Sequence, residues 1–157
     1  LPRLRDRLGT PPGVIVVGPA EAPSVKALAA DGVRLLGQVP DVAPFYARAR
    51  VVIAPTRFAA GVPHKVHEAA AHGVPTVVTS LLRDQLGWTH GQDVLVGETA
   101  DAFAAQCAYA HEDAELWARV RANALARMHA ECDPAHTRAA LARILPSLQE
   151  KPADAAS

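Results

Sequence analysis

The sequence predicts an α/β fold, in which a parallel β-sheet carries helices on both faces. Several short apolar runs lack polar alternation, which is typical of strands buried on both faces of a sheet. Single helical patterns separate these runs, as expected for βαβ units. Hydrophobic residues make up 50% of the 157 residues, and only 4% are aromatic. The predicted core is therefore built mainly from Ala, Val and Leu.

The first third of the chain alternates between helices and strands. Leu1, Leu4 and Leu8 recur at helical spacing, and Gly9 followed by prolines ends that helix. Asp41 is placed to cap a later helix. The pattern predicts strands over residues 14–17, 33–36 and 51–54, and helices over residues 24–30 and 42–49.

The rest of the chain becomes increasingly helical. Pro63 suits the first position of a helix that reaches His72 and ends at Gly73. The later pattern predicts strands over 76–78 and 94–96, then helices over 102–110, 114–129 and 135–148. It assigns no element to residues 79–93. Without repeats or an internal linker, we expect one domain over residues 1–150 and a frayed tail over 151–157.

The composition narrows the possible functions. Sixteen basic and sixteen acidic residues give a formal net charge of zero, which argues against non-specific nucleic-acid binding. No apolar run approaches about 18 residues, so no transmembrane segment is expected. No signal peptide opens the chain, which makes the cytoplasm the expected compartment, with a membrane contact possible only through another domain. Cys107 and Cys132 are interpreted as two buried free thiols.

One segment, which follows the third predicted strand, carries the chemistry. Ligands of open α/β sheets bind beyond the carboxyl ends of the strands. Gly61 permits a close backbone approach, and the helix start after it attracts phosphate. Lys65 and Glu68 share one helical face, where a cation can meet a phosphate and a carboxylate can bind a ribose diol. The alternative from spacing alone is a surface ion pair between them.

The same segment resembles a known family signature. Residues 61–79 read Gly-Val-Pro-His-Lys-Val-His-Glu-Ala-Ala-Ala-His-Gly-Val-Pro-Thr-Val-Val-Thr. This run is similar to the donor-site signature of group 1 (family 4) glycosyltransferases. Residues 15–18 (Ile-Val-Val-Gly), residues 36–42 (Leu-Gly-Gln-Val-Pro-Asp-Val) and the strand from Ala49 to Pro55 resemble further steps of that family in the same order. The resemblance covers roughly residues 13–145.

The resemblance implies the donor-binding, Rossmann-like C-terminal domain of a GT-B enzyme. Such a domain binds a nucleotide-diphosphate sugar, and an N-terminal domain of the same polypeptide binds the acceptor. The acceptor is expected to be a glycan or lipid, and the reaction is expected to be retaining. By resemblance, Glu68 binds the ribose hydroxyls. The other implied donor contacts are Lys65, Gly61 and Val62 at the diphosphate or sugar, Gln38 and Val39 at the base, and Gly18 and Pro19 along the cleft.

Two departures from the family pattern matter. Many members carry a second glutamate that touches the donor sugar, and the equivalent residue here is Ala60. The family domain also usually begins with a further strand and a basic loop, whereas this chain opens with the helix that follows them. We therefore expect a domain that lacks its first strand and is inactive alone.

Other readings of the sequence remain open. His64, His67 and His72 share one predicted helix, but they do not form a tight ligand set, so no metal and no cofactor is expected. His90 is interpreted as loop structure, and the charged residues of 115–131 as a solvated helix face. A non-catalytic nucleotide-binding or interaction domain of the same fold is the main alternative, and a phosphorylase or epimerase of GT-B shape is a third.

Overall fold

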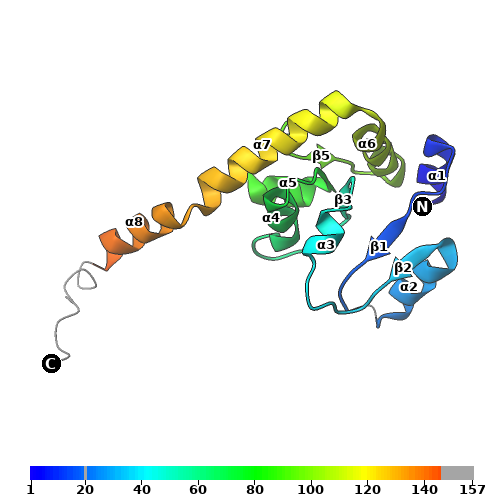
Figure 1. The fold of residues 1–157 in the computed structure, drawn as a ribbon, viewed down its shortest axis with the longest axis horizontal. Coiled ribbons are helices and arrows are strands. Elements are labelled where there is room, and N and C mark those ends of the chain that lie inside the picture. The colour runs from blue at the N-terminus through cyan, green and yellow to red at the C-terminus, as the bar shows by residue number, and fades with distance from the viewer. Residues whose placement is uncertain (20, 146–157) are drawn as a thin grey trace.

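The computed structural model describes residues 1–19 and 21–145. Within them, five parallel strands form two separate sheets (Figure 1). The smaller sheet pairs β1 (Val14–Val16) with β2 (Val33–Leu35). The larger sheet has the order β3 (Val52–Ala54), β4 (Thr76–Val78) and β5 (Leu95–Val96). The predicted α/β class and its parallel pairing are confirmed, but the strands do not join into one continuous sheet.

Helices cover both faces of the larger sheet, as the sequence predicted. Because neighbouring residues of a strand point to opposite faces, Val77 and Val78 enter different clusters. Val78 packs with residues of α4 (His64–Ala71), α5 (Ser80–Leu86) and α7 (Ala114–Cys132). Val77 packs with residues of α6 (Ala100–Glu112) and α7, and Leu4 of α1 (Pro2–Leu8) lies against that cluster.

Two predicted helices in the first third are shorter or tighter than expected. The helix predicted over 24–30 is α2 (Pro23–Lys26), continued by a 3₁₀ helix (Ala27–Asp31). The helix predicted over 42–49 is α3 (Ala43–Tyr46). The N-cap residue is Val42 rather than the predicted Asp41, although the Asp41 carboxylate, one residue earlier, accepts the Ala43 N–H at 2.9 Å. The chain then tightens, because the N–H groups of Arg48 and Ala49 donate to carbonyls only three residues back.

The helix α5 was not predicted at all. Its first residue, Ser80, donates its backbone N–H and its hydroxyl to the carboxylate of Glu98, at 3.0 and 2.9 Å. This cap comes from a residue far along the chain, so the local sequence does not show a helix start.

Side-chain caps begin the three helices of the C-terminal segment. Thr99, Asp113 and Asp133 each accept a backbone N–H in the first turn of α6, α7 and α8 (Pro134–Ile144), respectively. The helix predicted over 135–148 is α8, which ends at Ile144. Residues 146–148 of that prediction lie outside the described residues. The predicted tail over 151–157 also lies outside them. No helix in the described ranges is long and apolar enough to span a membrane.

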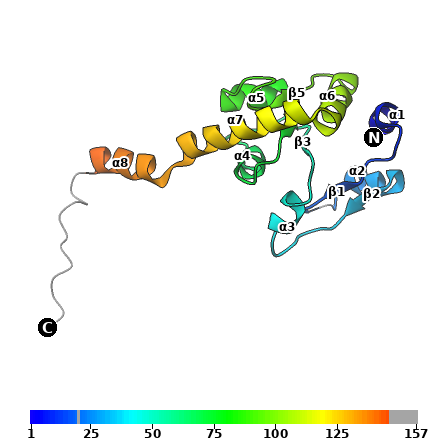
Figure 2. The same cartoon turned by 45° about the horizontal axis from the view of Figure 1, so that its top comes forward.

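The two cysteines have different environments. Cys107 is buried in α6, and burial raises the pKa of its thiol to about 12. Cys132 is exposed at the end of α7, so the prediction that both thiols are buried is wrong for this residue. The reason lies in the length of α7, whose last turns extend beyond the strands toward α8 (Figures 1 and 2).

Candidate functional site

At the carboxyl ends of strands β3 and β4, polar groups form a chain of hydrogen bonds along the edge of the larger sheet. Thr56 follows β3, and Thr79 follows β4. The Thr79 hydroxyl donates to the Thr56 carbonyl at 2.7 Å, and the Lys65 Nζ donates to the Thr56 hydroxyl at 3.0 Å. Because these strands are parallel, the loops that follow them lie at one edge, which is where α/β sheets bind ligands. The sequence alone predicts no role for either threonine.

Two helices, α4 and α5, begin at this edge, and they differ in whether a carboxylate already occupies the helix N-terminus. The start of α5 already holds the Glu98 carboxylate, which occupies the position an anionic ligand would take. No acidic residue lies in the first turn of α4, and Lys65 does. The local charge therefore favours an anion at α4 rather than at α5.

The backbone at the start of α4 differs in detail from the sequence prediction. Pro63 is the residue before the helix rather than its first residue, with φ −79° and ψ 73°. Gly61 has φ 85°, a conformation that favours glycine. The N–H groups of His64 and Val66 donate to the carbonyls of Val62 and Pro63, at 2.9 and 2.8 Å. These two amides are thus satisfied locally, and an anion at α4 would rely on Lys65 and the helix dipole.

The loop before α4 forms an open hollow at the surface. Its volume is about 480 Å³, and it is lined by Arg57, Phe58, Ala59, Ala60 and Leu81. Ala60, Gly61, Val62 and Lys65 are all exposed. Arg57, for which the sequence alone predicts no role, adds a second cation to this part of the edge.

The carboxylate of Glu68 is held by a tyrosine from another element. Tyr46, the last residue of α3, donates its hydroxyl to the Glu68 Oε2 at 3.1 Å. The Tyr46 ring stacks on the His72 ring, with centroids 4.6 Å apart. Burial and, to a smaller extent, the Glu68 carboxylate raise the pKa of Tyr46 to about 12. Since Lys65 bonds to Thr56 instead, the ion pair that spacing alone suggested does not form.

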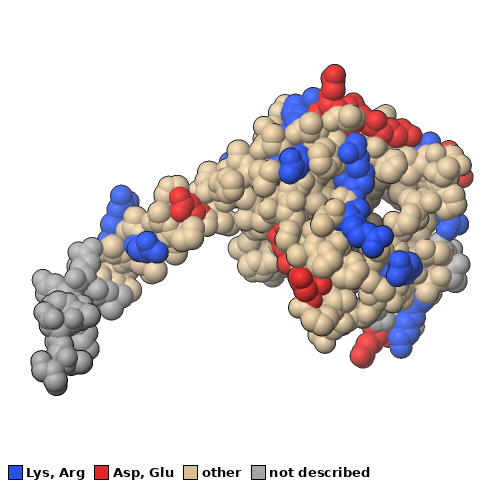
Figure 3. All heavy atoms as spheres, viewed as in Figure 1, with Lys and Arg blue, Asp and Glu red and all other residues tan. Residues whose placement is uncertain are grey.

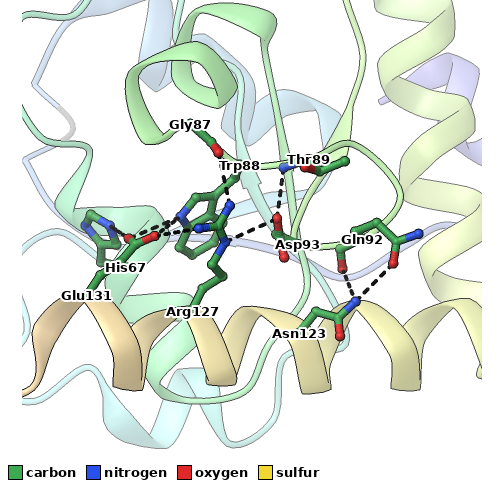
Figure 4. Close-up of polar contacts among 9 residues, drawn as sticks. All are labelled: His67, Gly87, Trp88, Thr89, Gln92, Asp93, Asn123, Arg127 and Glu131. Atoms are coloured by element: carbon green, nitrogen blue, oxygen red, sulfur yellow. Dashed lines mark hydrogen bonds and ion pairs between the residues drawn. The ribbon is translucent and has the colours of Figure 1, made fainter.

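A second hollow, also of about 480 Å³, is lined by residues of α4 and of the C-terminal half of α7. Glu131 of α7, which lines this hollow, accepts the Trp88 indole N–H at 3.2 Å and lies 3.7 Å from His67 (Figure 4). Arg127 donates to the Gly87 carbonyl, and its Nε lies 3.5 Å from Asp93. These contacts join α7 to the segment between α5 and β5. The interpretation of this helix face as solvated therefore holds for the exposed Glu115 but not for Arg127 and Glu131, which make these contacts.

The remaining predicted site residues follow the smaller sheet. The N–H of Gly18, after β1, donates to the Gly37 carbonyl at 2.8 Å, which brings the loop of Gly18 and Pro19 against that of Gln38 and Val39. The structure thus forms two groups of predicted residues, one after β1 and β2, and one around α4. The contact between Tyr46 and Glu68 links them, because α3 follows the loop of Gln38.

Four of the histidines, His67, His72, His90 and His136, have side-chain contacts within the protein. The His90 Nδ1 accepts the Val96 N–H at 3.0 Å, which agrees with its interpretation as loop structure. In the part of the chain that the structure describes, no three His, Cys, Asp or Glu side chains gather as a possible metal site.

The fold is that of an α/β domain with parallel sheets, and its candidate site lies at the carboxyl ends of the strands. The family model for the group 1 glycosyl transferases matches residues 1–113. The chain therefore belongs to this family, as the sequence resemblance implied. Among curated proteins, none matches this chain.

Solved structures share the fold of this chain. The Anabaena protein Alr3699/HepE in complex with UDP-glucose superposes with a TM-score of 0.75 at 23% identity, and its complex with UDP and glucose gives 0.72 at 22%. Both alignments cover 92% of this chain and 44% of the Anabaena chain. A glycosyltransferase from Rickettsia africae ESF-5 gives 0.77 at 14% identity, covering 95% and 44%. The chain thus spans less than half the length of these proteins.

Proposed function

We propose that this chain is the donor-binding part of a glycosyltransferase that uses a nucleotide-diphosphate sugar. The observation that carries the proposal is that α4 presents a carboxylate and a cation that are held by other groups and do not neutralise each other. Glu68 is held by Tyr46, while Lys65 lies on the strand edge beside Thr56. The Anabaena protein of similar fold was solved in complex with UDP-glucose, and this supports a nucleotide-diphosphate sugar as the ligand.

Each group would contact a different part of the donor. One carboxylate oxygen of Glu68 bonds to Tyr46, which leaves Oε1 and the free lone pairs of Oε2 to accept from the ribose hydroxyls. Lys65 and the positive end of α4 would face the diphosphate. As the sugar leaves, negative charge grows on that diphosphate, and a fixed cation stabilises it in the transition state.

The other predicted residues would complete the donor site. Gln38 and Val39 would meet the base, and Gly18 and Pro19 would line the cleft. Gly61 and Val62 would approach the diphosphate or the sugar, beside the hollow that contains Arg57 and Ala60. An N-terminal domain of the same polypeptide would bind the acceptor, a glycan or lipid. Transfer would retain the configuration of the sugar.

The test is donor affinity in the full-length protein. We expect Glu68→Ala to weaken the Kd for the nucleotide-sugar by about 10- to 100-fold, because the ribose diol loses charged hydrogen bonds worth about 1.5–3 kcal/mol. Glu68→Gln should be milder, since one acceptor remains. Glu112→Ala, which removes an exposed glutamate at the end of α6, is the matched control. A Kd for Glu68→Ala within about twofold of the parent would reject the assignment.

A non-catalytic domain of the same fold is the second candidate. The observation that favours it is Ala60, which places a methyl group where many relatives carry a sugar-binding glutamate. Sugar transfer by the full-length protein, measured with a panel of nucleotide-sugars, separates the two. We expect transfer by the full-length protein and none by residues 1–157 alone. Donor binding without transfer in the full-length protein would support the second candidate.

A further inference from the structure

The hollow formed by the loop before α4 combines one cation with an apolar wall. Of the residues that line it, Arg57 is charged, whereas Phe58, Ala59, Ala60 and Leu81 are apolar. Within the described residues, the Arg57 guanidinium makes no hydrogen bond or ion pair. A guanidinium carries five N–H donors in a rigid fork that matches a carboxylate. The hollow therefore offers unused donors and a positive charge to an anionic group.

The acidic side chains of the protein leave this charge in place. Glu98 caps α5 beside Leu81, but each of its carboxylate oxygens already accepts a hydrogen bond from Ser80. On the face drawn in Figure 3, the largest group of acidic side chains lies over the junction of α6 and α7. Position 60, where many family members carry a glutamate, is an alanine. A methyl group thus replaces the carboxylate that would repel an anion in the hollow.

The hollow lies next to the proposed diphosphate contact. Lys65 donates to the Thr56 hydroxyl at 3.0 Å, and Arg57 directly follows Thr56 in the chain, with its Cα about 3.8 Å from that of Thr56. On its other side the loop is fixed to α5, because the Gln85 Nε2 donates to the Ala59 carbonyl at 3.0 Å. A donor whose diphosphate lies at Lys65 would therefore bring its sugar within reach of the hollow.

We propose that this hollow binds the carboxylate of an acidic donor sugar, a hexuronate, and that Arg57 selects it. The inference rests on the proposed function, because it takes a nucleotide-diphosphate sugar as the ligand. A hexuronate carries a carboxylate at C6 where the corresponding hexose carries a hydroxymethyl group. Arg57 would donate two parallel N–H bonds to this carboxylate, while Lys65 faces the diphosphate.

The apolar wall of the hollow fits the rest of such a sugar. Phe58 is 93% exposed, and Ala59 and Ala60 are exposed beside it. One face of a pyranose ring consists mainly of C–H groups, which pack on an aromatic ring. With Phe58 against that face, the hollow would contact both the apolar and the charged part of a hexuronate. A neutral hexose would leave the Arg57 guanidinium without a partner.

Donor affinity in the full-length protein tests this proposal in two steps. The nucleoside diphosphate that binds most tightly among UDP, GDP, dTDP and ADP is identified first. The matched hexose and hexuronate of that nucleotide are then compared by titration calorimetry. We expect the Kd for the hexuronate to be at least about fivefold lower than that for the hexose, the lower part of the range for a charged hydrogen bond, because the hollow is open.

The variant Arg57→Gln assigns this preference to one side chain. We expect it to bring the two Kd values within about twofold of each other and to leave the Kd for the nucleoside diphosphate unchanged. Arg48→Gln is the matched control, since Arg48 is an exposed arginine that precedes β3, at the opposite end of the strands. It should preserve the preference for the hexuronate.

The reciprocal variant is Ala60→Glu, which places a carboxylate in the hollow. We expect it to raise the Kd for the hexuronate at least about fivefold through like-charge repulsion, with the Kd for the nucleoside diphosphate within about twofold of the parent. An unchanged Kd for the hexuronate would place the sugar carboxylate elsewhere and overturn the proposal.

The outcomes separate this proposal from the proposed function. A parent protein that binds the hexose as tightly as the hexuronate, or more tightly, overturns the proposal and leaves the proposed function standing. The same holds if Arg57→Gln weakens the nucleoside diphosphate and both sugars equally, which would make Arg57 a diphosphate contact. If none of the four nucleoside diphosphates binds, the proposed function fails and this proposal fails with it.

Discussion

At the scale of single residues, the contact between Tyr46 and Glu68 connects two parts of the chain. The hydroxyl fixes one carboxylate oxygen at the surface of α4, and the stacked His72 fixes the tyrosine ring. In the full-length protein, we expect Tyr46→Phe to weaken donor affinity by about 2- to 10-fold. This is less than the loss of a fully buried charged hydrogen bond, because the pair is partly solvated. Titration calorimetry with the nucleotide-sugar measures the change.

The phenol titration provides an independent readout. Because the pKa of Tyr46 is raised to about 12, folding favours the neutral phenol. The resulting stability is present below pH 10 and is lost as the pH rises from 10 to 12. Glu68→Gln should lower the Tyr46 pKa, since the carboxylate contributes to the shift. Tyr109→Phe, at an exposed position, is the control. Unchanged affinity and an unchanged phenol titration would show that the contact has no role.

At the scale of secondary-structure elements, the close approach of β5 to α6 depends on one glycine. A Cβ at Gly97 would lie 2.5 Å from the backbone nitrogen of Phe103, and it would also meet the Phe103 Cα. Backbone atoms cannot rotate away as a flexible side chain can. We expect Gly97→Ala to lower the free energy of unfolding by about 3 kcal/mol, the upper part of the usual range for overpacking. Urea unfolding measures it.

Gly13 provides the matched control for this substitution. It precedes β1, and a Cβ there would meet no atom within 4 Å. Gly13→Ala should therefore change the stability by less than about 1 kcal/mol, and it can even stabilise the protein by restricting the unfolded chain. Equal effects of the two substitutions would mean that α6 shifts easily away from β5.

The elements also show where sequence reasoning succeeds. The strand over 76–78 was predicted with its observed bounds, because an apolar run buried on both faces leaves a local signal. The helix α5 was missed, because its cap is the distant Glu98. The sequence pointed to Glu68 through the family resemblance rather than through its spacing to Lys65. Its partner Tyr46 could not be predicted, since only the packing of α3 on α4 brings them together. The hollow beside Arg57 is likewise set by tertiary packing.

At the scale of the whole molecule, stability is concentrated around the larger sheet. Leu82 of α5 is 1% exposed and packs in the cluster that contains Val78 and Trp88. Leu28, in the 3₁₀ helix before β2, is 40% exposed. We expect Leu82→Ala to destabilise the larger sheet by about 2–5 kcal/mol. Native-state hydrogen exchange should show faster exchange at the Val78 amide with little change in β2.

The reciprocal variant tests whether the two sheets are separate cooperative units in residues 1–157. Leu28→Ala should change the free energy of amide exchange in β2 by less than about 1 kcal/mol. It should leave the exchange of the Val78 amide unchanged. If Leu82→Ala accelerated exchange equally in both sheets, the chain would unfold as one unit despite its divided strands.

The environment of Trp88 gives the protein an internal optical probe. Trp88 is 3% exposed, and its ring makes a T-shaped contact with the His67 ring at a centroid distance of 5.7 Å. The indole N–H donates to the Glu131 carboxylate. Indole fluorescence depends on nearby charge and polarity, and His67 directly precedes Glu68 in α4. A ligand that shifts α4 would therefore alter the emission of a residue that it does not touch. The second tryptophan, Trp117, bonds to the Arg50 carbonyl and lies under its guanidinium, so it can report separately on the opposite end of α7.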